Sequence, residues 1–304
     1  MMRSVLRWGK HTLLGVINIG QLGRLREQGD YLMREVSRLA AAERRAQWQQ
    51  RRGSTLGAQT KASFDFQWEQ MPSGRALPSD EAFMGDVEAH ICRLTQLPRE
   101  WFAGKRIVDV GCGIGRFSYG LLKLGAIVTA CDQSEAALRR TAELCDPFRD
   151  RLSLKRIDLL EWGEPGDFDL AWSFGVVHHT GNTYLAIENV CRKVRPGGRL
   201  FLMIYGMPDS RADLAEINQY ERIAEEVRGL SFEQRKELLN ARFGAAAAHG
   251  WFDAISPRIN DRLSFEEIHD VLSELGFAAI RQTVPARDHH VVGERASNGS
   301  AAAV

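Results

Sequence analysis

The sequence predicts an α/β protein of the Rossmann-like type, in which helices cover both faces of a mostly parallel sheet. Two observations lead to this prediction. From residue 79 onward, segments with helical periodicity alternate with apolar runs typical of buried strands. One such run opens the stretch "VDVGCGIGRFSYG" at residues 108–120, where three glycines separate a strand from a helix. A strand, a glycine turn and a helix N-terminus form a concavity lined with backbone N–H groups, which accepts a polar or anionic ligand.

The elements of the expected sheet follow in chain order. Gly125 ends the helix after the glycine turn, and Ser134 caps the next helix. The sequence "RPGG" at residues 195–198 predicts a turn before the fifth strand. We expect strands at residues 106–111, 126–132, 152–158, 168–175 and 199–205, and helices at residues 80–94, 116–124, 134–144 and 182–194.

Charge is distributed unevenly along the chain. The net charge of the 304 residues is +1, but residues 1–60 hold 11 Lys and Arg against four Asp and Glu. The remainder is therefore mildly acidic, which argues against a nucleic-acid-binding body. The five cysteines are odd in number and include no CxxC pair, so we expect reduced thiols and no metal site.

The sequence predicts a basic helical arm over the N-terminal 60 residues. Their apolar stretch at residues 12–19 is too short to span a bilayer, and no cleavage site follows it. Residues 30–52 form a better amphipathic helix, with Leu32, Val36, Leu39 and Ala46 on one face, and residues 53–57 read as a linker. The arm either packs on the main domain or on a second subunit, or rests on an anionic membrane surface, or directs the chain to an organelle. We expect a cytoplasmic protein. The alternative is a cytoplasmic protein whose arm makes peripheral contact with a membrane surface.

Two cofactor classes fit the glycine turn. A dinucleotide-binding fold uses G-x-G-x-x-G, with an acid about 20 residues further on that holds the ribose. Here the spacing is G-x-G-x-G, at Gly111, Gly113 and Gly115, and Asp109 precedes it. Asp132 ends the second expected strand, where it could hold a ribose in either class. The glycine triplet alone is a weak signal.

The surrounding motifs decide between the two classes. Five stretches, "VDVGCGIGRF", "VTACDQS", "IDLLEW", "FDLAWSFGVVHHT" and "VRPGGRLFLMIYG", follow one another over residues 104–206. In this order and at these intervals, they resemble the core of class I S-adenosylmethionine-dependent methyltransferases, in particular the bacterial type 11 and type 12 group. More loosely, "FDFQW" at residues 64–68 and "SPR" at residues 256–258 are similar to features of some members.

The resemblance implies a seven-stranded sheet, with an antiparallel edge hairpin at residues 278–284 and 289–296. It also implies a helical insertion that carries Trp251 and Phe252 and forms a lid over the acceptor; a scaffold or dimerisation pair of helices is the alternative. The expected organisation is a basic arm at residues 1–60, a helical cap at 61–103, a cofactor-binding core at 104–206, a lid at 207–263, a last helix and hairpin at 264–296, and a disordered tail at 297–304.

For the cofactor, the resemblance assigns a role to each motif residue. The three glycines let the backbone approach S-adenosylmethionine, and Asp109 receives its ammonium group. Asp132 takes the two ribose hydroxyls. The remaining contacts come from four residues: Gln133 beside the adenine, Asp158 and the Leu159 backbone at the adenine amino edge, and Phe174 near the sulfonium.

Methyl transfer depends mainly on alignment of the acceptor with the cofactor. It needs a general base only when the attacking group of the acceptor must lose a proton. His178 and His179 follow the fourth strand, where the acceptor is expected, and Tyr205 ends the fifth strand as a second acceptor-side candidate. We therefore expect O-methylation of a small-molecule or carbohydrate-like acceptor. The alternatives are C- or N-methylation of a small molecule, or a non-catalytic protein that binds S-adenosylmethionine. The loop at residues 173–179 differs from that of enzymes that methylate bases, so no nucleic acid is expected as a partner.

Overall fold

The computed structural model describes residues 28, 31–32, 35, 39–48 and 55–297. Its contacts divide the chain into two units, residues 1–47 and residues 48–304. In the first unit the described residues are helical, as expected for residues 30–52, and Tyr31, Leu32 and Leu39 expose about 60% of their surface. The predictions for residues 1–26 and for the tail at residues 298–304 lie outside the described residues.

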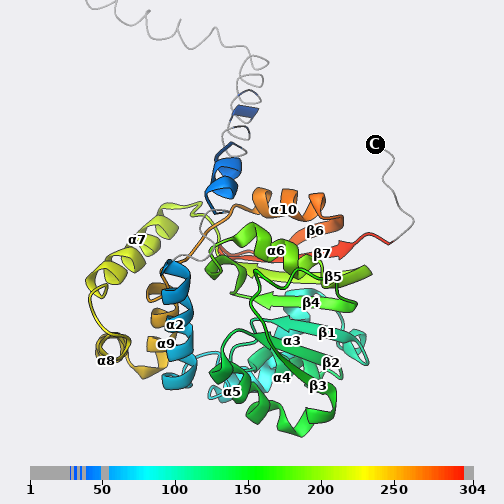
Figure 1. The fold of residues 1–304 in the computed structure, drawn as a ribbon, viewed down its shortest axis with the longest axis horizontal. Coiled ribbons are helices and arrows are strands. Elements are labelled where there is room, and N and C mark those ends of the chain that lie inside the picture. The colour runs from blue at the N-terminus through cyan, green and yellow to red at the C-terminus, as the bar shows by residue number, and fades with distance from the viewer. Residues whose placement is uncertain (1–27, 29–30, 33–34, 36–38, 49–54, 298–304) are drawn as a thin grey trace, which may run out of the picture. The chain divides into compact units, whose positions relative to one another are not determined.

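The second unit is built on a seven-stranded sheet, which confirms the predicted fold class. Its strand order is β3-β2-β1-β4-β5-β7-β6. The first five strands run parallel, and β7 pairs antiparallel with both β5 and β6. The strands are β1 (Arg106–Val110), β2 (Ile127–Asp132), β3 (Leu152–Arg156), β4 (Phe168–Phe174), β5 (Val194–Ile204), β6 (Phe277–Val284) and β7 (His289–Arg295). The expected C-terminal hairpin is therefore present (Figure 1).

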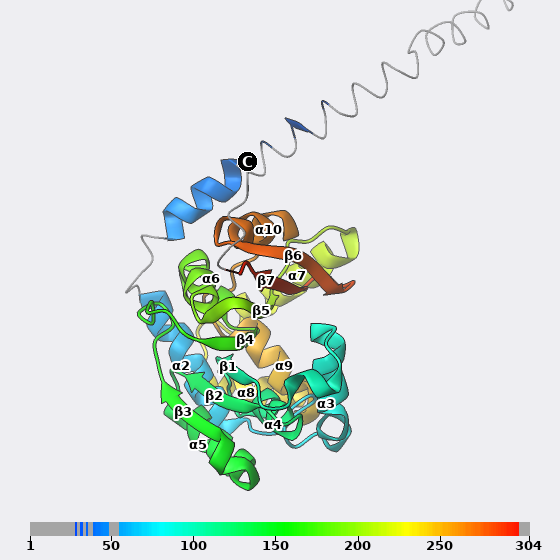
Figure 2. The same cartoon turned by 90° about the vertical axis from the view of Figure 1, so that its right-hand side faces the viewer.

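Helices cover both faces of this sheet because its central strands are apolar on both sides. In β4, for example, Ala171 belongs to one core cluster, and its neighbours Leu170 and Trp172 belong to the other. The first face is covered by α6 (Thr183–Cys191) and α10 (Phe265–Glu274), and the second by α3 (Glu81–Thr95), α4 (Arg116–Lys123) and α5 (Glu135–Cys145). Figure 2 shows the same layers from the side.

Four further helices form a separate layer. They are α2 (Thr55–Gln70), α7 (Arg211–Glu226), α8 (Phe232–Phe243) and α9 (Ala245–Ile255), and they share a third apolar cluster. Figure 1 shows α2 and α9 opposite the ends of the central strands. Short 3-10 turns occur at Arg99–Phe102, Asp146–Arg151 and Val177–His179.

Three sequence predictions need correction here. Residues 55–57 are the first turn of α2 and not a linker, and the expected boundary after residue 60 falls inside this helix. The turn predicted at residues 195–198 is part of β5, because Val194 pairs with Phe168 and a register shift absorbs the glycines. Within the insertion expected at residues 207–263, α9 carries Trp251 and Phe252, and Phe252 is fully buried in the apolar cluster.

Candidate functional site

A cavity of about 660 Å³ opens where the parallel strands end. Its volume lies in the range of roughly 300–1,000 Å³ that ligand pockets span. The strand ends supply one wall, and α2 and α9 supply the opposite one. The predicted site residues that line it are Asp109, Gly111, Gly113, Asp132, Gln133, Asp158, Leu159, Phe174 and His179, whereas Gly115 and His178 do not.

The first two glycines are needed for the shape of this wall. Gly111 and Gly113 have φ values of +74° and +53°, a conformation that favours glycine. A Cβ on Gly111 would lie 2.3 Å from Cγ2 of Val176, and one on Gly113 would lie 3.1 Å from the ring of Trp68. The loop is anchored because the N–H of Gly111 donates to the carbonyl of Cys131 at 2.7 Å.

Gly115 has a different task from the one expected. It begins α4 with φ +85°, and a Cβ there would meet Oγ1 of Thr141 at 2.9 Å, on α5. Its missing side chain therefore lets two helices pack closely. The expectation that it leaves room for a cofactor is not supported by its position.

Asp132 is held by backbone groups at the end of β2. Its Oδ2 accepts the N–H of Gly113 at 3.0 Å, and its Oδ1 accepts the N–H of Ser134 at 2.9 Å. Each carboxylate oxygen can accept a further hydrogen bond. Burial raises the pKa of Asp132, and the two backbone N–H groups oppose this rise.

Asp109 lies deeper in the same wall. Only 2% of its surface is exposed, and the hydroxyl of Ser118 donates to its Oδ2 at 2.6 Å. Burial raises its pKa to about 7, although the bond from Ser118 opposes the rise. A cation bound beside this carboxyl would favour its ionised form.

The remaining predicted cofactor contacts lie around the mouth of the cavity. Asp158 is exposed, and its Oδ1 accepts the N–H of Leu160 at 2.9 Å, while Leu159 is buried. Gln133 is exposed after β2. Phe174 lies with its ring centroid 5.1 Å from the guanidinium of Arg116. With Glu161, the carboxyls on this side make the cavity attractive to a cation.

The two histidines occupy different environments. His178 is fully buried outside the cavity; its Nδ1 accepts the N–H of Tyr205 at 3.4 Å, and its Nε2 has no hydrogen-bond partner among the described residues. Burial holds the pKa of His178 well below the usual range. His179 lines the cavity, and its Nδ1 lies 2.8 Å from the carbonyl oxygen of Ile259. Because a carbonyl only accepts, Nδ1 carries the proton and Nε2 keeps its lone pair. Burial lowers the pKa of His179, and Asp253 opposes this effect.

His179 and Tyr205, predicted from the sequence for the acceptor side, both line the cavity, but the residues of α2 and α9 that face them were not predicted. On α2, Gly57, Lys61, Phe64 and Trp68 line the cavity, and their spacing of three and four residues places them on one helix face. That periodicity could have been found in the sequence. Asp253 on α9 also lines the cavity, and the hydroxyl of Tyr205 donates to its Oδ2 at 3.1 Å. No sequence signal points to Asp253.

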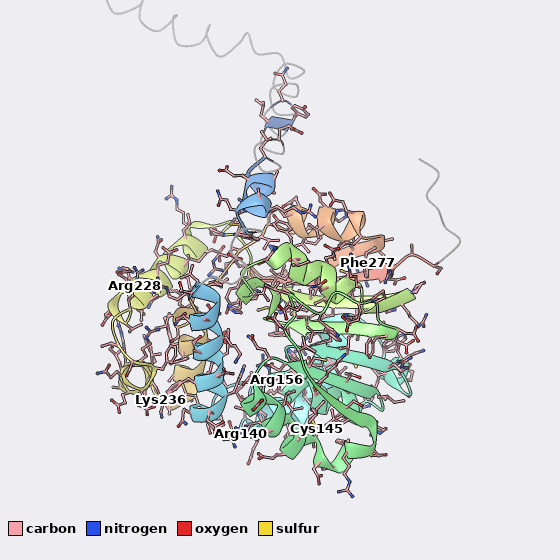
Figure 3. The ribbon with its side chains drawn as sticks, viewed as in Figure 1. Arg140, Cys145, Arg156, Arg228, Lys236 and Phe277 are labelled. Carbon is pink, nitrogen blue, oxygen red and sulfur yellow. The ribbon has the colours of Figure 1, made fainter. Side chains whose placement is uncertain are left out.

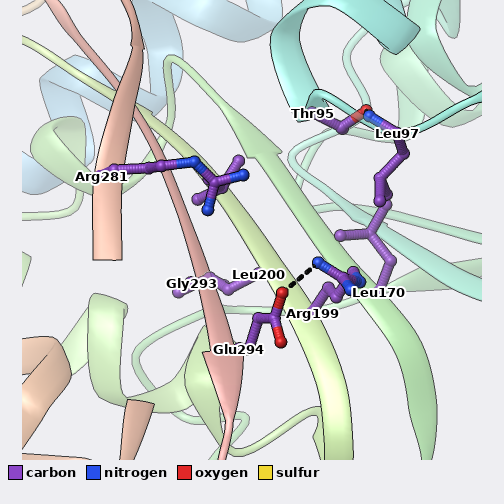
Figure 4. A pocket seen from close by; sticks show the side chains of 9 residues that line it. Thr95, Leu97, Leu170, Arg199, Leu200, Arg281, Gly293 and Glu294 are labelled. Atoms are coloured by element: carbon purple, nitrogen blue, oxygen red, sulfur yellow. Dashed lines mark hydrogen bonds and ion pairs between the residues drawn. The ribbon is translucent and has the colours of Figure 1, made fainter. Parts of the chain in front are cut away.

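Not every hollow among the described residues has room for a ligand. A hollow of about 10 Å³ lies over the paired strands β5 and β7, lined on its other side by Thr95 and Leu97 (Figure 4). It has room for about one water molecule. Within the described ranges, no group of three or more His, Cys, Asp and Glu side chains is arranged to hold a metal ion, and no helix is long and apolar enough to cross a membrane.

Comparisons with known proteins agree with this geometry. A family model described as "Methyltransferase domain" matches residues 108–200. The ubiquinone biosynthesis O-methyltransferase of Dechloromonas aromatica is 36% identical over 102 residues, which cover 33% of this chain and 44% of the relative. The mitochondrial enzyme of the same name from Schizosaccharomyces pombe is 34% identical over 107 residues, covering 34% of this chain and 39% of the relative. The matches therefore span less than half the length of these curated relatives.

Among solved structures, an O-methyltransferase family protein from Burkholderia thailandensis is 15% identical, with a TM-score of 0.49, and the match covers 71% of this chain and 58% of that one. The family model, the curated relatives and the order of the seven strands lead to one assignment. Residues 108–200 of this chain are similar to a methyltransferase domain.

Proposed function

We propose that this protein transfers a methyl group from S-adenosylmethionine to a hydroxyl of a small-molecule acceptor. The observation that carries the proposal is the cavity at the strand ends. The strand ends hold the glycine turn and buried carboxyls, and the turn after β4 adds His179, whose Nε2 keeps its lone pair. The similarity to two ubiquinone biosynthesis O-methyltransferases supports transfer to oxygen.

The carboxyl-rich wall suits the cofactor. Asp132 would accept the ribose hydroxyls, because backbone N–H groups already fix both of its oxygens. Asp109 would receive the ammonium group, and Phe174 would lie near the sulfonium. Gln133, Asp158 and the Leu159 backbone would surround the adenine, at the mouth of the cavity. These roles remain proposals that binding measurements can test.

S-adenosylmethionine supplies an electrophilic methyl group bound to a sulfonium sulfur. Transfer of this methyl group leaves a neutral thioether. The protein therefore has to align the acceptor, exclude water and remove the hydroxyl proton. His179 is the base we propose, with Nε2 as the atom that takes the proton and the carbonyl of Ile259 holding the ring in that tautomer. His178 lies outside the cavity, so its contribution would be to support Tyr205, on whose ring it stacks at 4.0 Å.

The acceptor would lie against α2 and α9. Phe64 and Trp68 offer ring faces, while Asp253 and Tyr205 offer hydrogen-bonding groups. A phenol or a sugar could stack on such rings and bond to such groups. C- or N-methylation of a small molecule is the second candidate, since an amine or a stabilised carbanion would not need His179. A non-catalytic protein that binds S-adenosylmethionine is the third.

The N-terminal arm is proposed to make peripheral contact with an anionic membrane or with a second copy of the chain. The support is its charge, with 11 Lys and Arg in residues 1–60, and the exposure of Tyr31, Leu32 and Leu39. Flotation with vesicles that contain or lack anionic lipid tests the first contact, and sedimentation over a range of concentrations tests the second. If the protein neither floats with the vesicles nor self-associates, this role of the arm is excluded.

Calorimetry with S-adenosylmethionine and with NAD tests the cofactor assignment. We expect saturable heat with the first compound and none with the second; the opposite result would overturn the proposal. Incubation of the protein with methyl-labelled S-adenosylmethionine and a metabolite extract then tests catalysis. An O-methylated labelled product supports the proposal, an N- or C-methylated product favours the second candidate, and cofactor binding without transfer favours the third.

A further inference from the structure

A second chamber adjoins the cavity described above. Its volume is about 420 Å³, and it shares Trp68, Leu77, Arg116 and Asp253 with the first cavity. The residues that line only the second chamber come from the loop after α2 and from α7 and α9: Arg75, Tyr220, Ala246, Ala247, His249, Gly250 and Trp251.

The charges of the two spaces differ. The charged residues that line the first cavity and not the second chamber are Asp109, Asp132, Asp158, Glu161 and Lys61, which gives the first cavity an excess of carboxyls. The second chamber is lined by two arginines and by Asp253, whose Oδ2 already accepts the Tyr205 hydroxyl. An anionic group is therefore repelled from the cofactor half and attracted to the second chamber.

The other polar side chains of the second chamber have partners. His249 donates from Nδ1 to the carbonyl of Met71 at 2.8 Å and accepts at Nε2 from the amide of Gln67 at 2.9 Å. It is thus neutral, and burial lowers its pKa, with Asp253 opposing this effect. The hydroxyl of Tyr220 donates to Glu216 at 2.6 Å. The arginines remain as the charged side chains with donors to offer.

Arg116 is held mainly by aromatic faces. Its guanidinium lies 4.8 Å from the ring centroid of Phe117 and 5.1 Å from that of Phe174. Its Nη1 donates to the carbonyl of Ala76 at 2.7 Å, and no other hydrogen bond of this side chain is made to a described residue. A guanidinium has five N–H donors in a planar fork, which matches a carboxylate or phosphate.

Arg75 lies on a loop that is rigidly held. Its own N–H donates to the carbonyl of Ala246, and the N–H of Ala76 donates to Oδ2 of Asp80 at 2.8 Å. Ala76 has φ +56°, a strained conformation for alanine, and its carbonyl receives Arg116. The side chain of Arg75 is exposed and makes no hydrogen bond or ion pair with the described residues. The strained loop thus brings the two arginines to one chamber.

We propose that the second chamber binds an anionic group of the acceptor, a carboxylate or a phosphate, through Arg75 and Arg116. The inference rests on the proposed function, because it places the acceptor's reacting hydroxyl at His179 and its charged end beyond Trp68. It narrows the substrate class to hydroxylated small molecules that carry a negative charge.

The test uses the full chain saturated with S-adenosylhomocysteine, after binding of that compound has been measured for each variant. Benzoate, phenyl phosphate and benzamide are then titrated at constant salt concentration, and tryptophan fluorescence is recorded because Trp68 and Trp251 line the chamber. Benzoate and benzamide have the same shape and differ in charge. The variants are Arg75→Gln and, as a control with the same loss of charge, Arg228→Gln at an exposed position after α7 (Figure 3).

We expect at least one of the two anions to bind about tenfold more tightly than benzamide, and Arg75→Gln to remove this preference while Arg228→Gln retains it. Which anion binds more tightly distinguishes a carboxylate from a phosphate. Equal binding of all three probes, no saturable binding of either anion, a preference that survives in Arg75→Gln, or competition of the anion with S-adenosylhomocysteine would overturn the inference. Failure to bind S-adenosylhomocysteine would instead overturn the proposed function.

Discussion

Replacement of Asp132 by alanine tests the cofactor side of the site most directly. The substitution removes a carboxylate that is fixed by the N–H groups of Gly113 and Ser134 and that we expect to accept two ribose hydroxyls. Hydrogen bonds to charged groups contribute about 1.5–3 kcal/mol each, but the variant can admit water to the vacated space. A net loss of about 2–3 kcal/mol in the free energy of S-adenosylmethionine binding follows, which is about 30- to 150-fold in Kd.

Asp132→Ala should also lower the stability of the fold, because the backbone N–H groups of Gly113 and Ser134 lose the carboxylate that accepts their hydrogen bonds. A second variant separates the two effects. Ser134→Ala removes the side chain that caps α5, where Oγ accepts the N–H of Ala137 at 3.4 Å, and should cost about 1 kcal/mol of stability. Ser134 does not line the cavity, so its loss should leave the Kd nearly unchanged.

Calorimetric titration with S-adenosylmethionine provides the assay, and circular dichroism confirms that each variant is folded. The reasoning is refuted if folded Asp132→Ala binds within twofold of wild type. It is also refuted if Ser134→Ala weakens binding as much as Asp132→Ala does, because the effect would then be one of stability alone.

Three further predictions concern pH, catalysis and the N-terminal arm. Since burial raises the pKa of Asp109 to about 7, its ionised form is lost below that pH, so S-adenosylmethionine affinity should fall up to about tenfold per pH unit below 7. Calorimetry from pH 5.5 to 8.5 checks this, and a dependence that persists in Asp109→Asn contradicts it. His179→Ala should lower turnover of an identified hydroxyl acceptor by about 10²–10⁴ with unchanged cofactor affinity. Because burial lowers its pKa, the wild-type rate should hold to a pH below the usual histidine range; comparable losses in His178→Ala at equal stability would contradict the assignment. Removal of residues 1–47 should leave a folded unit that binds S-adenosylmethionine, because Trp48 packs in the core against Tyr184 and stays in place. Removal of residues 1–60 should weaken binding, since Gly57 and Ala58 line the cavity; equal affinity of the two truncated chains would show that this turn of α2 is dispensable.

The local signals of the sequence were sufficient for the sheet and for one wall of the site. Apolar runs such as residues 200–204 are buried on both faces only in a parallel sheet covered by helices, so the pattern predicts the layers. The ends of such strands meet at one edge, which is why Asp109 and Asp132 could be placed together before the structure was known.

The opposite wall depended on tertiary structure. Asp253 meets Tyr205 across 48 residues of sequence, and this approach follows from how α9 packs on α2 in an apolar cluster of their own. The difference between His178 and His179 was likewise invisible in the sequence, since adjacent residues point in different directions according to the turn that holds them. Local periodicity and turn chemistry determine where a strand or helix forms, whereas long-range packing decides which side chains face a shared cavity.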